Sequence, residues 1–128
     1  MEIGMRSWIA YLLVASTVLL TVAGQFIVKW QVLRAGHIPD GPQAQLEFML
    51  SLLSKPWILS AFLLAFIASV TWMLAMTKLD LSHAYPMTAL TFVLVVVGSS
   101  LLFAEPVTTP KLAGLALVVL GIVVGSQG

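Results

Sequence analysis

The sequence predicts an all-α membrane protein with one domain, residues 1–128, that contains four transmembrane helices and one amphipathic helix in the membrane interface. Of the 128 residues, 60% are apolar and 9% are charged, whereas a soluble domain carries about 25% charged residues. The charged residues also leave four stretches uncharged, of 22, 22, 24 and 17 residues. A helix needs roughly 17–25 residues to cross the hydrocarbon core of a bilayer, so each stretch fits one span.

The first span is expected over 7–30, where Arg6 and Lys29 enclose 22 uncharged residues. Trp8 and Trp30 bracket it, as is usual for aromatic side chains at the two membrane interfaces. Its apolar run is longer than the core of a signal peptide, and no small-residue cleavage site follows. We therefore expect this span to stay in the mature protein.

The connection from residue 31 to residue 55 is the least apolar part of the chain. Residues 37–42 contain two prolines and one glycine, which predicts a turn. Over 43–54, apolar side chains recur with helical spacing and predict an amphipathic helix in the interface. The alternative is an N-terminal extension of the second span, broken at Pro56. The apolar face of this helix consists of Leu46, Met49, Leu50 and Leu53.

The other three spans follow the remaining uncharged stretches. The second is expected over 56–77 and has Trp57 at its interfacial start. The third is expected over 82–103, and the short connection before it makes these two helices antiparallel neighbours. The fourth is expected over 110–125, because Thr108-Thr109-Pro110 suits the first turn of a helix.

The basic residues give a weak signal for the orientation of the chain. The positive-inside rule places the more basic side in the cytoplasm, which here is the side of the long connection. The margin is two residues, so insertion in both orientations stays open. The more basic side carries Lys29, Arg34, Lys55 and Lys111, and the other side carries Arg6 and Lys78.

The composition and the motifs argue against several classes of function. The chain has no cysteine, and its two histidines, His37 and His83, are far apart. It contains none of the common hydrolase, zinc-protease or phosphate-loop motifs, so we expect no enzyme, no metal and no cofactor. A net charge of +1 indicates no surface for nucleic acid. The expected surroundings are membrane lipids.

Polar side chains at membrane depth are the candidate binding residues. Gln25 and Lys29 are four residues apart and share one face of the first span. Lys29 either binds a ligand or extends its ammonium group to the interface, and Gln25 either faces a cavity or joins two helices. Tyr85 precedes a proline that removes a backbone donor near the start of the third span. Glu105 at the end of that span either binds a ligand or belongs to a plain loop.

Glycines on the last span predict a helix-packing surface. Gly114 and Gly121 are seven residues apart on one face, and Gly121 and Gly125 form a GxxxG pattern. The packing is either within the chain or between two subunits. Four helices barely enclose a path through a membrane, and the two halves of the chain show no repeat. We therefore expect a second copy or a sister subunit to complete the path.

Several of these motifs occur together in a known family. The chain resembles the small multidrug resistance family and the wider drug/metabolite transporter superfamily. It is most similar to the branch of undecaprenyl-phosphate-aminoarabinose flippase subunits, and the resemblance covers most of the chain outside 31–54. The motifs that carry it are Ala23-Gly24-Gln25 with Lys29, Ala84-Tyr85-Pro86-Met87, Glu105-Pro106 and Gly114 with Gly121-Ile122-Val123.

One position departs from the pattern of the drug exporters. Those proteins have a glutamate in the first helix for proton-coupled exchange, and the matching position here is Thr21. The spans contain no other carboxylate. This difference disfavours a proton-coupled drug pump and favours the flippase branch.

The resemblance implies a flippase of the bacterial inner membrane, and we expect it to act as a dimer with alternating access. Its substrate is a polyprenyl phosphate that carries a sugar, such as undecaprenyl-phosphate-aminoarabinose used in lipopolysaccharide modification. A phosphate in a low dielectric needs a cation or several donors; Lys29 and Gln25 are the candidates, with Arg34 at the entrance. Glu105 is the candidate for the sugar amine. Trp72 and Tyr85 either flank the sugar ring or pack against neighbouring helices. The alternatives are an exporter of small cations or metabolites and an accessory subunit without transport of its own.

Overall fold

The computed structural model describes residues 2–128, with side chains from Trp8 onward, and every regular element in this part of the chain is a helix. The Arg6 side chain, which enters the charge count above, lies outside the described side chains. Three helices are long and apolar enough to cross a membrane. A fourth apolar helix, α6 (Thr109–Gly125), is shorter, with 17 residues.

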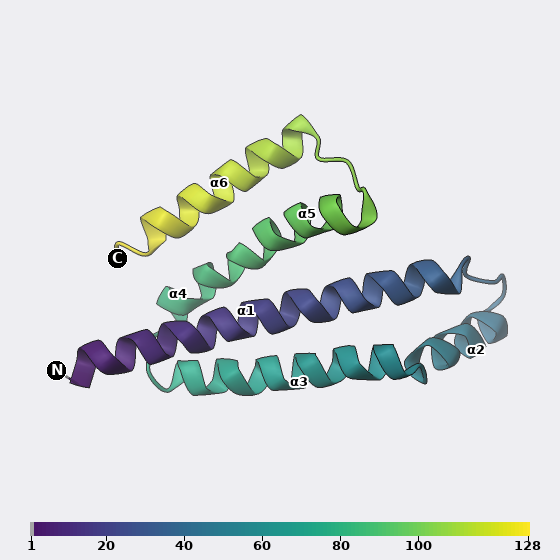
Figure 1. Ribbon diagram of the computed structural model, residues 1–128, viewed down its shortest axis with the longest axis horizontal. Helices are drawn as coiled ribbons and strands as arrows, with labels where there is room; N and C mark the ends of the chain where they lie inside the picture. Colours follow the sequence, from purple (N-terminus) through teal and green to yellow (C-terminus); the bar gives the residue numbers. More distant parts are fainter. Residues whose placement is uncertain (1) are drawn as a thin grey trace.

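The first and third helices lie side by side and antiparallel (Figure 1). These are α1 (Glu2–Ala35) and α3 (Pro56–Met76). Small and β-branched side chains face the contact and allow a close approach of the two backbones. A hydrogen bond of 2.7 Å between the Thr17 and Thr71 hydroxyls adds a polar link across it. The buried hydrophobic residues are Ala10, Val14, Val18 and Val22 on α1 and Ile58, Ala61, Ala68 and Ala75 on α3.

The connection after α1 contains a separate helix, α2 (Pro42–Leu53). It ends at a turn over Ser54 and Lys55, and α3 begins with Pro56. The helix predicted over 43–54 is therefore present, and it is a helix of its own. Its position in the membrane interface stays a prediction.

The third span is interrupted near its start. It consists of α4 (Leu81–Ala84), the 3₁₀ helix η1 (Tyr85–Ala89) and α5 (Leu90–Phe103). Pro86 lies in η1 and has no N–H to donate to the preceding turn, which favours the tighter winding there. The span ends at Ala104, whose positive φ of 54° closes the helix in a left-handed turn.

The helix α6 packs on α5, and the two ends of the chain lie at the same end of the molecule (Figure 1). The Thr108 side chain caps α6 by accepting a hydrogen bond from the Lys111 N–H. Leu115 is the buried residue that α6 contributes, and most other side chains of the helix are exposed. The helix therefore leaves a large apolar surface without contacts from the rest of the described chain.

Candidate functional site

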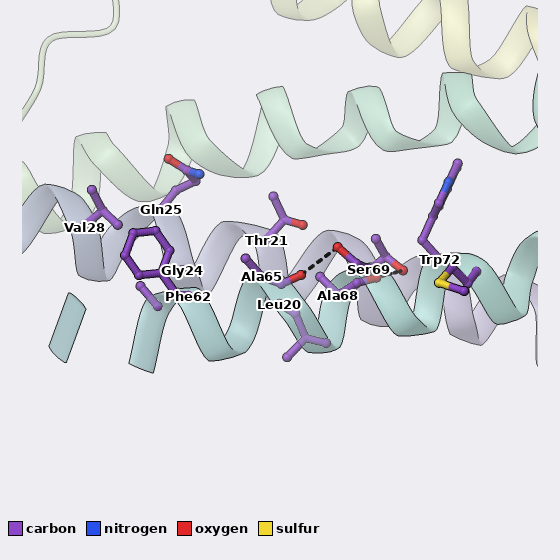
Figure 2. Close-up of a pocket in the computed structure, with 13 residues that line it drawn as sticks. Leu20, Thr21, Gly24, Gln25, Val28, Phe62, Ala65, Ala68, Ser69 and Trp72 are labelled. Carbon is purple, nitrogen blue, oxygen red and sulfur yellow. Dashed lines mark hydrogen bonds between the residues drawn. The ribbon is translucent and has the colours of Figure 1, made fainter. Parts of the chain in front are cut away.

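A groove of about 490 Å³ runs between α1 and α3 near the middle of both helices (Figure 2). Most of its wall is apolar, but several polar side chains reach it. Gln25, Thr21 and Trp72 point to the same side of the groove in Figure 2. The Ser69 hydroxyl donates to the Ala65 carbonyl one turn earlier at 3.0 Å. The lining residues are Thr17, Leu20, Thr21, Gly24, Gln25, Val28, Ala61, Phe62, Ala65, Ala68, Ser69, Trp72 and Met73.

Four polar side chains of α1 form one row along the helix. Thr17, Thr21, Gln25 and Lys29 follow one another at intervals of four residues. Residues four apart lie on the same face of a helix, and twelve residues of helix span about 18 Å. This row therefore extends over more than half of a hydrocarbon layer about 30 Å thick.

At one end of the row, Lys29 forms an ion pair with Glu105. The Lys29 Nζ lies 3.4 Å from the Glu105 Oε1, and the two side chains are 46% and 40% exposed. Lys29 lies one turn beyond Gln25 on α1, and Glu105 directly follows the turn that closes α5. The structure thus brings together two candidate residues that are far apart in the sequence. Each has its charge partner and stays accessible to a ligand.

Two aromatic side chains meet at the other end of the groove. The rings of Trp72 and Tyr85 are 6.0 Å apart and nearly perpendicular. Trp72 lines the groove from α3, and Tyr85 is exposed at the start of η1. Close by in the sequence, the His83 ring accepts or donates a hydrogen bond of 2.8 Å with the Tyr11 hydroxyl. His83 is therefore a hydrogen-bonding residue between α4 and α1.

The remaining candidate residues lie away from the groove. Arg34 is in the last turn of α1, and its guanidinium group stacks over the Trp30 ring at 5.3 Å. The three glycines of α6 lie on open surface, because a Cβ built on any of them meets no atom within 4 Å. No other described helix packs against them, so the expected packing at Gly114, Gly121 and Gly125 is not made within the described chain.

The structure also adds residues that the sequence motifs did not single out. Thr17, Thr71 and Ser69 supply hydroxyl groups in or beside the groove. Near the Lys29–Glu105 pair, the Phe26 ring lies against Gly98 and packs at 6.2 Å from the Phe103 ring. The sequence could have indicated these three hydroxyl residues, because they lie inside spans that are otherwise rich in aliphatic residues. The contact between Phe26 and Gly98 has no such signal, because it depends on how two distant helices meet.

The arrangement is chemically suited to binding. An ion pair, a carboxamide and a row of hydroxyls can hold a polar group beside an apolar wall. Among residues 2–128, no three His, Asp or Glu side chains gather as a metal site requires.

The chain is similar to curated proteins over most of its length. It is 35% identical over 116 residues to a protein of Pseudomonas aeruginosa, covering 87% of this chain and 91% of that protein. It is 35% identical to one of Serratia proteamaculans, covering 92% and 96%, and 34% identical to one of Pectobacterium atrosepticum, covering 88% and 94%. All three are named "probable 4-amino-4-deoxy-L-arabinose-phosphoundecaprenol flippase subunit ArnE". No protein-family model and no solved structure matches the chain.

Proposed function

Because the chain belongs to the ArnE family of 4-amino-4-deoxy-L-arabinose-phosphoundecaprenol flippase subunits, we propose that it moves this lipid-linked amino sugar across the bacterial inner membrane. The family consists of transporter subunits rather than enzymes. The observation that carries the proposal is the polar row of α1, which leads from the groove to a cation and an anion side by side. A head group with one phosphate and one amine presents the complementary two charges.

The polyprenyl tail stays in the hydrocarbon throughout, so the protein needs to shelter only the head group. Lys29 and Gln25 bind the phosphate, because a phosphate outside water requires charge-assisted donors. Glu105 pairs with the amine of the sugar. Trp72 and Tyr85, at the other end of the groove, flank the sugar ring after the head group has moved along the polar row, and Arg34 attracts the phosphate at the entrance.

A second subunit completes the path. The groove is open on one side, and α6 presents an unpaired glycine face to its surroundings. In this proposal α6 spans the membrane as the fourth transmembrane helix and packs against a second copy or a sister subunit. Rocking of the two subunits about this contact then gives alternating access. The word "subunit" in the names of the relatives supports such an assembly.

The groove is less suited to a proton-coupled drug exporter. Thr21, at the position of the glutamate in those exporters, is a neutral groove residue here. The carboxylate of Glu105 is already paired with Lys29. A cationic drug therefore meets no free carboxylate among the described groove residues.

The test replaces Lys29 by Gln in bacteria whose own family member has been deleted, so that any sister subunit is present. We expect Lys29→Gln to abolish translocation while membrane insertion continues, because the phosphate loses its cation. The readout is labelling of the lipid amine by an amine reagent that does not cross the membrane. Lys78→Gln, in the connection between α3 and α4, is the matched control and should label normally. Normal labelling with Lys29→Gln would remove Lys29 from the mechanism.

A further inference from the structure

The ion pair between Lys29 and Glu105 has a consequence for which lipids the groove accepts. We propose that this pair selects zwitterionic head groups, so that the protein binds the sugar-loaded carrier lipid and rejects the unloaded polyprenyl phosphate. This inference rests on the proposed function and concerns the same site. It assigns Glu105 the role of a specificity-determining residue rather than a general contact.

The selection follows from counting charge pairs before and after binding. Without substrate, Lys29 and Glu105 form an ion pair in which Nζ and Oε1 are 3.4 Å apart. The loaded lipid brings a phosphodiester anion and an alkyl ammonium group, so one internal pair is replaced by two pairs with the ligand. Each charge on both sides has a partner in the complex, which is the condition for placing charges in a low dielectric.

The unloaded carrier lipid has the phosphate but lacks the amine. When the phosphate of the unloaded lipid pairs with Lys29, Glu105 loses its charge partner. The Glu105 carboxylate then lies beside a second anion, the phosphate. A phosphate monoester carries close to two negative charges near neutral pH. Like charges placed together are unfavourable, and an unpaired charge away from water adds to the cost. The Glu105 carboxylate therefore pairs with the ammonium group of the loaded lipid and repels the phosphate of the unloaded lipid.

The surrounding contacts hold Glu105 in place when the pair opens. Ala104 adopts the left-handed turn, and the N–H groups of Ala104 and Glu105 both donate to the Ser99 carbonyl. The neighbouring cation, Lys111, donates from Nζ to the Pro106 carbonyl at 3.1 Å. Among the described side chains, Lys29 is the charge partner of Glu105 until a ligand replaces it.

An apolar contact keeps the two helices together during this exchange. Phe26, one turn before Lys29 on α1, packs against Gly98 and Phe103 of α5. This contact contains no charged group, so it persists when the ammonium group of Lys29 turns from Glu105 to the phosphate. The exchange therefore needs only side-chain rotation of two residues that are about half exposed.

The experiment compares three lipids on the full-length chain, co-purified with any sister subunit, in nanodiscs, with bound lipid measured by native mass spectrometry in pairwise competition. The lipids are the loaded carrier, the unloaded polyprenyl phosphate and a loaded carrier whose amine is acetylated. The acetylated lipid keeps the sugar and loses the positive charge. We expect the unmodified protein to prefer the loaded lipid roughly tenfold over each of the other two, which corresponds to about 1.4 kcal/mol.

Glu105→Gln removes the negative charge and keeps the shape of the side chain. We expect this variant to bind all three lipids with similar affinity, mainly because it gains affinity for the unloaded carrier. Asp80→Asn, in the connection between α3 and α4, is the matched control and should keep the preference of the unmodified protein.

The outcomes separate the two proposals. If the unmodified protein binds the loaded and the acetylated lipids equally, or if Glu105→Gln keeps the full preference, the selection by charge is wrong while the flippase proposal stands. If none of the three polyprenyl lipids competes with bulk phospholipid, both proposals fail. Loss of the preference in Glu105→Gln but not in Asp80→Asn supports the selection.

Discussion

Gly98 determines how closely α5 approaches α1. A Cβ built on Gly98 would overlap the ring of Phe26, whereas the glycines of α6 have open space around them. The contact beside the Lys29–Glu105 pair therefore requires the smallest residue at this position. Packed interfaces tolerate added volume poorly, because neighbouring side chains must leave their preferred rotamers.

We expect Gly98→Leu to lower the free energy of unfolding by about 1–3 kcal/mol, the usual effect of overpacking. Thermal unfolding in mild detergent, followed by circular dichroism, measures the change. Gly114→Leu is the control, because its site is open within the chain. In the Gly98→Leu background, Phe26→Ala should restore part of the stability. Equal melting temperatures for the two glycine variants would show that α1 and α5 do not pack in this way.

The hydroxyl pair between Thr17 and Thr71 stabilises the contact of α1 and α3. Hydrogen bonds between membrane helices contribute about 0.6 kcal/mol on average. We expect a double-mutant cycle of Thr17→Val and Thr71→Val to give a coupling energy of about this size. Ser69→Ala, combined with either substitution, is the control, because the Ser69 hydroxyl bonds within its own helix. A coupling energy of zero for the threonine pair would contradict the contact.

Single residues of the candidate site were easier to predict than their partners. Lys29 and Gln25 stand out because polar groups are rare within apolar spans. The pairing of Lys29 with Glu105, and of Trp72 with Tyr85, depends on how α5 and η1 lie against α1 and α3. Residue spacing within one helix holds no information about that contact. The sequence therefore predicted which side chains are candidates, and the fold determines which of them meet.

The ends of the helices lie close to the positions that the charged residues predicted. The spans predicted over 56–77 and 110–125 correspond to α3 and α6 within one residue at each end, since a charged residue near the bilayer centre is costly. The first helix is longer than predicted and continues to Ala35. The predicted span ended beside Lys29, whereas the backbone stays helical through Lys29 and Arg34, because a charged residue does not by itself end a helix. The interruption of the third span at η1 follows from Pro86. The positions of the charged residues could not predict it, because proline carries no charge.

The helix α2 presents an apolar face that the described part of the chain leaves uncovered. Leu46, Met49 and Leu50 are 59%, 53% and 57% exposed, whereas an amphipathic helix is stable when its apolar face is buried. Lipid at the membrane interface provides such a surface. The structure thus leaves the predicted face free to contact the bilayer.

We expect α2 to lie in the interface with this face toward the acyl chains. The chain has no native cysteine, so single cysteines at Leu46 and Leu50 can carry nitroxide labels without background. Their collision rate with oxygen should exceed that with a water-soluble nickel reagent. Labels at Glu47 and Ser51, on the other face, are the control and should show the reverse. Equal accessibility on both faces would mean that α2 lies in water.

The described chain encloses its groove incompletely, and α6 has contacts on one side only. The described part of α6 packs against α5 and η1, while Gly121 and Gly125 face open space. Glycines on a membrane helix allow another helix to approach closely. In the proposed assembly, a second subunit on this face covers α6 and supplies the missing wall of the path. The proposed flippase mechanism therefore places a second subunit on this face.

We expect native mass spectrometry from gentle detergent to show a particle of two subunits, either two copies of this chain or one copy with a sister subunit. Gly121→Leu and Gly125→Leu should convert most of it to the single chain, because the added side chains separate the two helix backbones. The fold of the single chain should not change, since neither glycine has a neighbour within 4 Å that a side chain would displace. Val123→Leu, on the opposite face of α6, is the control and should keep the two-subunit mass. A two-subunit particle that survives both glycine substitutions would place the contact elsewhere on the molecule.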